Sequence, residues 1–398
     1  MTTNDNVIRF SSAAHGFRPG RLLIPDRLVE ARLAERKTQT ELANLVGVSR
    51  QAVSSYEMGD KQPEPETMAN IARHLKQPIG YFTRPEMASF GRRSTLFFRK
   101  VGTDTKRRNQ ACSVYADWLV STAATLSEYA NYPAVDLPSF EPSGKFDSYS
   151  EDEIEDCAEK VRQHFGLGWG PISNVVRLLE AKGIVVCRVE MEGENVEAFS
   201  FWSGDRPFVF LSSDKSSGAR ARYDAAHEMG HLCLHRWIGE EEIEDKSRLK
   251  EIEREANRFA GAFLLPRRSF PNEVYSSRAE SFIDLKARWK AAIQAMVYRC
   301  KDLGLFDDRQ ATNLYKQISY KKWRKTEPLD DGPSKIEIEA PVVLAQITSL
   351  LLESGKLSGA DIASKLGLST KVLSQMLSVD EAALTGSDEV EAFRPTLK

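Results

Sequence analysis

Two histidines and a glutamate lie within five consecutive residues near the middle of the chain. His227, Glu228 and His231 form the pattern His-Glu-x-x-His. On a helix, residues four apart project from the same face, so both imidazoles can reach one zinc ion. The carboxylate of Glu228 is then placed to accept a proton from a zinc-bound water. The pattern therefore predicts zinc-dependent hydrolytic chemistry.

A catalytic zinc ion needs a third protein ligand and keeps one position for water. The candidates are Glu251, Glu253 and Glu255, on the next predicted helix. The apolar face of that helix carries Ile252, Ala256, Phe259 and Phe263. At about 100° per residue, Glu255 lies roughly 60° from the centre of this face and the other two about 100° away. Because a carboxylate at the edge of a buried face is costly unless it is paired, we predict Glu255 as the third ligand.

His235 continues the histidine stripe by one more turn. Eight residues of helix rise about 12 Å, so His227 and His235 cannot share one ion. We expect His235 to support the ligands or the packing instead.

The elements around this motif read as a small sheet with helices. Helices are predicted over 151–166 and 174–182, and a strand over 184–189. Two further strands, 197–202 and 207–211, are joined by a hairpin, and the motif helix spans 219–236.

The N-terminal part has a different pattern, that of several short helices. Thr38 is a plausible N-cap for a helix over 39–46, with Glu41 in the position of a capping box. Gly47 ends that helix, and Ser49 caps the next one, 50–58. Two short helices around such a turn indicate a helix-turn-helix.

The residues of this turn closely resemble those of the XRE/Cro-type repressors. The resemblance runs from Gln39 through Leu42-Ala43 and Gly47-Val48-Ser49 to Pro63. It implies a double-stranded DNA operator, with Arg50–Tyr56 as the recognition helix in the major groove. The side chains expected to contact DNA are Arg50, Gln51, Ser54 and Ser55 at base edges, and Gln39 and Lys61 at phosphates.

A weaker copy of the same pattern lies near the C-terminal end. Residues 358–369 align register for register with residues 38–49, which predicts a second three-helix unit at 340–380. Its third helix, 370–377, is apolar and has Lys371 as its one basic residue, so packing or dimerisation is favoured over DNA binding.

The connector between the two regions has two predicted elements. Residues 94–101 read as a strand, and 106–130 as a helix with a broad apolar stripe. Such a stripe must be buried, against either the next domain or a second subunit. Proline, serine and glycine then mark a linker at 133–144.

The motif region resembles the ImmA/IrrE family of metallopeptidase-like proteins. The similarity begins at Pro171, includes Arg222–His235 and Glu255–Pro266, and ends at Pro328. It implies zinc on His227, His231 and Glu255, with Glu228 as the general base. It also implies a protein substrate, since members typically cleave or inactivate a partner repressor, and many members carry an XRE domain as this chain does.

Composition agrees with a globular protein of several domains. The chain has 398 residues, a net charge of −2 and five scattered cysteines. Scattered cysteines favour a reducing cytosol. A net charge near zero means that a DNA-binding surface must be confined to one part of the protein. No apolar run has the length of a membrane span. We expect a cytoplasmic, nucleoid-associated protein.

The predicted fold class is mainly α, an α+β multidomain chain. Its expected parts are a flexible tail (1–20), a five-helix helix-turn-helix domain (21–84), a connecting helix with linker (85–145), a zincin-like domain with a small sheet (146–330) and a C-terminal helical unit (331–398).

Three functions fit these features. The first is a homodimeric DNA-binding regulator with a zinc peptidase that cuts a repressor, an antitoxin or its own linker. The second is a ligand-sensing regulator whose zinc domain binds without cutting. The third is a component of a toxin–antitoxin, prophage or stress switch.

Overall fold

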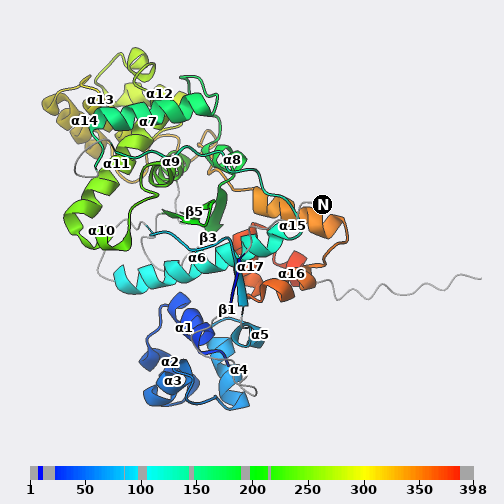
Figure 1. Cartoon of the computed structure of the whole chain (residues 1–398). Coiled ribbons are helices and arrows are strands. Elements are labelled where there is room, and N and C mark those ends of the chain that lie inside the picture. Colours follow the sequence, from blue (N-terminus) through cyan, green and yellow to red (C-terminus); the bar gives the residue numbers. More distant parts are fainter. Residues whose placement is uncertain are drawn as a thin grey trace, which may run out of the picture. The chain divides into compact units, whose positions relative to one another are not determined.

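The computed structural model describes residues 8–11, 23–84, 86–96, 105–142, 148–189, 198–213 and 217–385. Within these residues the fold is mainly helical, with one three-stranded sheet and one pair of short strands (Figure 1). The predicted fold class is therefore confirmed. The chain divides into unit 1 (Met1–Gly91, Lys100–Asn131 and Val343–Lys398) and unit 2 (Arg92–Arg99 and Tyr132–Val342).

The helix-turn-helix forms the N-terminal part of unit 1. Its helices are α1 (Pro25–Ala34), α2 (Gln39–Val46), α3 (Arg50–Glu57), α4 (Pro65–His74) and α5 (Ile79–Phe82). Thr38 and Glu41 form the predicted capping box, Gly47 ends α2 with a left-handed φ of 75°, and Ser49 caps α3. Leu28, Leu42, Val53, Ile71 and Phe82 are fully buried and form its core.

Strand β1 (Ile8–Ser11) pairs antiparallel with β2 (Glu86–Ser89). The flexible tail expected over 1–20 is therefore wrong at these four residues, and its remainder lies outside the described residues. Of the strand expected over 94–101, residues 97–101 are also outside them. Ser94 lies beside the sheet of unit 2, where its backbone N–H donates to the carbonyl of Trp202 (2.8 Å).

Helix α6 (Thr105–Ser127) buries its apolar stripe inside unit 1, against α1, α16 (Gly359–Leu366) and β2. The indole of Trp118, 1% exposed, donates to the hydroxyl of Tyr81 (3.1 Å). Arg107 pairs with Glu41 at the start of α2 (3.4 Å). From the sequence, the next domain or a second subunit is expected to cover this stripe. That expectation is wrong for the part of the stripe that α1 and α16 cover. Its partners are elements that are distant in sequence but belong to the same unit.

The second three-helix unit is present as α15 (Val343–Glu353), α16 and α17 (Thr370–Leu377), followed by α18 (Ala382–Thr385). Its turn repeats the first one: Ser358 and Asp361 form a capping box, Gly367 has a φ of 70°, and Ser369 caps α17. These helices were expected to form a unit of their own. They instead belong to unit 1, where Arg84 donates to the carbonyls of Ser364 (2.7 Å) and Lys365 at the end of α16.

Unit 2 contains the sheet and the motif helix. Strand β5 (Arg206–Ser212) lies between β3 (Val185–Val189), which is parallel to it, and β4 (Ala198–Ser203), which is antiparallel. The α-helices of unit 2 are α7 (Glu151–His164), α8 (Val175–Ala181), the motif helix α9 (Gly218–Leu234), α10 (Glu240–Glu244), α11 (Lys246–Leu264), α12 (Phe282–Trp289), α13 (Ile293–Asp302) and α14 (Asp308–Tyr320). Helix α9 packs on β4, β5 and α11, and α11 packs also on α7 (Figure 1).

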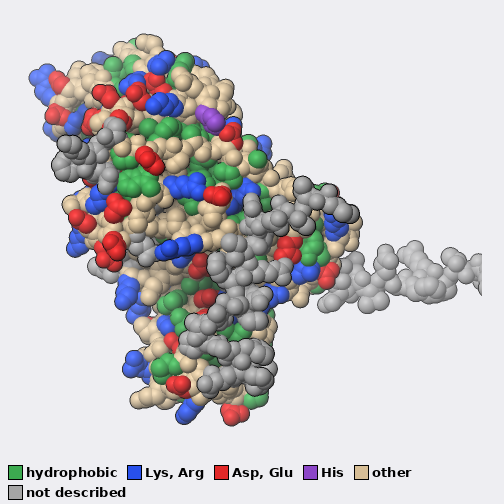
Figure 2. Space-filling model, in the orientation of Figure 1, with side chains coloured by type: hydrophobic (Ala, Val, Ile, Leu, Met, Phe, Trp, Pro, Cys, Tyr) green, Lys and Arg blue, Asp and Glu red, His purple; other side chains and the backbone are tan. Residues whose placement is uncertain are grey.

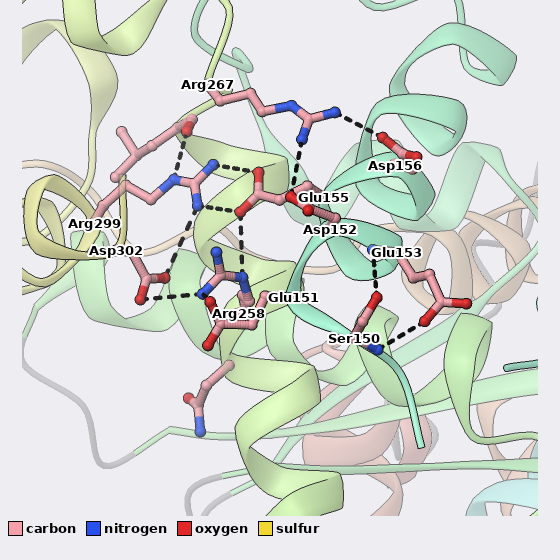
Figure 3. Close-up of polar contacts among 12 residues, drawn as sticks. Ser150, Glu151, Asp152, Glu153, Glu155, Asp156, Arg258, Arg267, Arg299 and Asp302 are labelled. Carbon is pink, nitrogen blue, oxygen red and sulfur yellow. Dashed lines mark hydrogen bonds and ion pairs between the residues drawn. The ribbon is translucent and has the colours of Figure 1, made fainter. Parts of the chain in front are cut away.

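A buried network of charged side chains fixes α7, α11 and α13 to one another. Arg299 on α13 donates to both carboxylate oxygens of Glu155 on α7, at 2.5 and 2.7 Å (Figure 3). Arg258 on α11 lies 3.5 Å from the same carboxylate and 3.3 Å from Asp302. Since α11 follows the motif helix in the chain and packs against it, this network also orients α11 toward α9.

An extended segment, the strap (Ile336–Val342), runs past the start of α9. The carboxylate of Glu339 accepts from the backbone N–H groups of Val175 (2.8 Å) and Val176 (3.0 Å) and pairs with Arg222 of α9. Gly218, the first residue of α9, faces the carbonyl oxygens of the strap so closely that a Cβ there would overlap them. The strap therefore holds the first turn of the motif helix.

Acidic and basic side chains are interspersed on the face drawn in Figure 2, as the net charge of −2 leads one to expect. No helix among the described residues is long and apolar enough to span a membrane.

Candidate functional site

The candidate DNA-reading surface lies on α3. Arg50 and Gln51 are exposed in its first turn, while Ser54 and Ser55 are half-buried one turn later. Lys61 is exposed in the loop that follows α3. All four residues expected at base edges therefore lie on one short helix. Val53 and Tyr56 are buried on the other side of that helix.

Gln39 has a defined partner within the domain. Its side-chain amide donates to Glu57 (2.8 Å), and Arg32 also pairs with Glu57 (2.5 Å). Glu57 therefore holds the side chain of Gln39 in place at the start of α2, where the phosphate contact was expected.

The two histidines of the motif face one another on α9. Their Nε2 atoms are 3.0 Å apart, and the side chains are nearly buried, with 6% of His227 and 2% of His231 exposed. Two ligands about 2.0–2.1 Å from a tetrahedral zinc ion lie roughly 3.3 Å apart, so the observed spacing suits such a site. The helical spacing thus brings both imidazoles to one point, as the sequence predicted.

The carboxylate beside these nitrogens belongs to Glu253, not to Glu255. Its oxygens are 3.5 Å from the Nε2 atoms of both His227 and His231. Ligand atoms of these three residues all lie within 4.8 Å of one another, and this is the one such group among the described residues. Neither oxygen of Glu253 has a hydrogen-bond partner within that part of the chain. Two buried acceptors without donors fit a cation, so the site is suited to a divalent metal.

The expectation that Glu255 is the third ligand therefore needs correction. Glu255 is fully buried, as its place near the apolar face of α11 predicted. Its oxygens, however, accept from the backbone N–H of Tyr149 (3.0 Å) and contact Nε2 of His235 (2.8 Å). The argument from helical phase correctly required a partner for this carboxylate, but the partners are His235 and a main-chain amide. Glu251 is 37% exposed and pairs with Arg248.

A close crossing of α9 and α11 explains why Glu253 reaches the histidines. A Cβ on Gly230 would lie 3.3 Å from the backbone of Ala256, so the two helices approach closely at this point. Glu253 precedes Ala256 by three residues and therefore lies on the same side of α11, about one turn away. The small residues Gly230 and Ala256 are the signal in the sequence that could have identified the facing turn.

Burial controls the charge of the site. It lowers the pKa of His231 to about 3, so this imidazole is neutral at pH 7 and can offer a lone pair. Burial also acts to raise the pKa of Glu253, but the two adjacent imidazoles outweigh it and hold that pKa well below its usual range. His231 therefore offers a neutral nitrogen beside the carboxylate of Glu253.

Glu228, the remaining polar residue of the motif, is also buried, with 3% of it exposed. Burial raises its pKa to about 8, although His227 beside it acts in the opposite direction. Its Oε2 atom has no hydrogen-bond partner in the described part of the chain, and its backbone carbonyl accepts from the hydroxyl of Ser200 on β4 (3.2 Å). A divalent cation bound nearby would favour the ionised form that a general base needs.

Comparisons with known proteins agree with both halves of this description. Residues 28–82 match the sequence model of a helix-turn-helix family, and residues 179–301 match that of the IrrE N-terminal-like domain. The chain thus combines an XRE-type helix-turn-helix with an IrrE/ImmA-like domain.

One relative is an uncharacterized HTH-type transcriptional regulator, YqaE, of Bacillus subtilis (strain 168). It is 28% identical over 64 residues, which are 16% of this chain and 55% of the regulator. The chain therefore matches about half the length of that relative. The domain shared with that regulator is the helix-turn-helix.

Proposed function

We propose that this chain is a transcriptional regulator and that its IrrE/ImmA-like domain is a zinc-dependent metallopeptidase. His227, His231 and Glu253 would hold the zinc ion, and Glu228 would be the general base. The observation that carries the proposal is the convergence of two imidazole nitrogens and a carboxylate whose oxygens have no hydrogen-bond partner among the described residues.

The chemistry follows from the positions of these side chains. Zinc bound there would lower the pKa of a coordinated water and polarise a peptide carbonyl. Glu228 accepts a proton from the attacking water at its carboxylate and returns it to the nitrogen of the leaving amine. The imidazoles and Glu253 remain in place through both transfers, because helix α9 and its packing against α11 fix them.

The helix-turn-helix would bind a double-stranded DNA operator through α3. Arg50 and Gln51, exposed at its first turn, suit guanine and adenine edges respectively, with Ser54, Ser55, Gln39 and Lys61 as further contacts. A homodimer would present two such helices to half-sites about 34 Å apart. The Arg50→Ala/Gln51→Ala variant should lose sequence-specific footprinting and keep its metal content. An unchanged footprint would reject the assignment of α3.

The substrate would be a partner repressor, as the family resemblance implies, an antitoxin, or the chain's own linker at 133–144. The test is incubation of the zinc-loaded chain with the products of neighbouring genes, followed by mass spectrometry. Wild type should produce defined cuts and Glu228→Gln none, with zinc content and fold unchanged in the variant. Equal cutting by both proteins would contradict the role of Glu228.

A second candidate is a ligand-sensing regulator whose zinc domain does not cut. A hollow of about 670 Å³ in unit 2 favours it, since that volume suits a small molecule. Polar residues that line the hollow include Ser173, Asn174, Arg177, Lys290 and Lys335. This candidate predicts that release of the operator survives Glu228→Gln unchanged, whereas the peptidase predicts its loss.

A further inference from the structure

The imidazole of His231 has a second ring nitrogen, which faces away from the proposed metal site. Its Nε2 atom faces His227 and Glu253, while its Nδ1 atom lies 3.0 Å from the Nδ1 atom of His235. His235 is the residue one turn further along, at the end of α9, and only 1% of it is exposed. One ring nitrogen of His231 is thus directed to the metal site and the other to a buried histidine.

The contacts continue from His235 to a carboxylate and then to the main chain. Nε2 of His235 is 2.8 Å from Oε2 of Glu255, and Oε1 of Glu255 accepts from the backbone N–H of Tyr149 (3.0 Å). The hydroxyl of Tyr149 lies within hydrogen-bond distance of the carbonyls of Phe140 (2.8 Å) and Leu234 (3.0 Å). The far end of the chain of contacts is therefore fixed to the backbone.

For two neutral imidazoles, one arrangement of protons satisfies these contacts. Glu255 accepts from two N–H groups, so the proton of His235 lies on Nε2 and its Nδ1 offers a lone pair. The proton of His231 must then lie on Nδ1, where it donates to His235, and its Nε2 offers a lone pair to the metal site. In the opposite tautomer of His231, two lone pairs would face each other at 3.0 Å.

We propose that Glu255 and His235 form a positioning relay that holds His231 in the tautomer and orientation needed to bind a cation. The proposal rests on the metal site assigned above to His227, His231 and Glu253. Neither relay residue has a ligand atom in that group, so both act through His231. Loss of such a partner typically weakens metal binding about 10–100-fold.

The experiment compares two substitutions of His235 in the full-length chain. Glutamine can accept at Oε1 and donate at Nε2, as this histidine does, whereas methionine fills similar space and does neither. Zinc affinity is measured by chelator competition. The tautomer of His231 is read from ¹⁵N chemical shifts of the metal-free protein after selective histidine labelling, which is practical because the chain has six histidines.

The relay predicts that His235→Met weakens zinc binding about 10–100-fold and that His235→Gln largely restores it. It also predicts the Nδ1–H tautomer of His231 in metal-free wild type and a mixture of tautomers in His235→Met. Equal affinity losses in both variants, or an unchanged tautomer in His235→Met, would overturn the relay.

Two outcomes keep this test separate from that of the metal site. If wild type binds no zinc, the proposed metal site is wrong, and the tautomer comparison on the metal-free protein still decides the relay. If His235→Met does not fold, Glu255→Met replaces it, because methionine has no oxygen to accept from His235 or from the backbone N–H of Tyr149. The relay then predicts weaker zinc binding and a perturbed tautomer in Glu255→Met, and unchanged values would reject it.

Discussion

Replacing Arg299 by methionine should destabilise unit 2 strongly, because it leaves a buried carboxylate without its main partner. The side chains of Arg299 and Glu155 are 1% and 3% exposed. Arg299 donates to both oxygens of Glu155 (Figure 3). It also donates to the carbonyl of Leu265 (3.0 Å). Methionine fills much of the same space and donates nothing.

The size of the effect follows from these contacts. Removing one partner of a buried ion pair costs about 3–5 kcal/mol. Arg258, 3.5 Å from Glu155, still compensates part of the remaining charge, so we expect a value near the lower limit, about 3 kcal/mol. For a domain of roughly 150–250 residues this corresponds to a fall in Tm of about 6–12 °C.

Thermal unfolding of the full chain, followed by circular dichroism, measures the effect. Lys301 provides a matched control on the same helix, since its pair with Asp308 is 52% and 85% exposed. Lys301→Met should change stability by less than about 1 kcal/mol. The double variant Arg299→Met/Glu155→Leu should recover much of the loss, because no charge is then left buried. If Arg299→Met and Lys301→Met lowered Tm equally, the reasoning from burial would be refuted.

Three further effects follow from the structure. Gly218→Ala should lower the free energy of unfolding, measured by urea titration, by about 1–3 kcal/mol, because a Cβ there would lie 2.5 Å from a carbonyl oxygen of the strap. Gly239→Ala is the control and should be nearly neutral, because a Cβ there would have no atom within 4 Å. Ser49→Ala should cost about 1 kcal/mol, since the hydroxyl caps α3, and an unchanged Tm would show that the cap contributes nothing. Lowering the pH from 6.5 to about 3 should destabilise the metal-free chain. Burial lowers the pKa of His231 and His235 to about 3, so in this pH interval these two imidazoles bind protons in the unfolded chain but not in the folded one. His235→Gln should flatten this pH dependence of the urea midpoint, and an identical slope would contradict it.

Local features were well predicted from the sequence, because short-range interactions determine them. The caps at Thr38 and Ser49 and the end of α2 at Gly47 are all contacts between residues close in the chain. The same holds for His227 and His231, whose spacing on one helix is sufficient to place both imidazoles together.

Features that depend on packing between distant elements were not predictable in the same way. Helical phase identified Glu255 as a buried carboxylate, but which side of α11 faces α9 depends on the close crossing at Gly230. The stripe on α6 required a cover, and the sequence alone could not identify α1 and α16 as that cover.

The metal content of three proteins tests the central claim most directly. Zinc bound by the purified full chain is measured by mass spectrometry of the metal, with Glu253→Gln as the test variant. Glu251→Gln is the matched control, because Glu251 lies two residues away on α11 and pairs with Arg248 at the surface. We predict one zinc ion per chain in wild type and in Glu251→Gln, and its loss in Glu253→Gln with the fold retained. A wild-type chain without zinc, or full zinc binding by Glu253→Gln, would contradict the account.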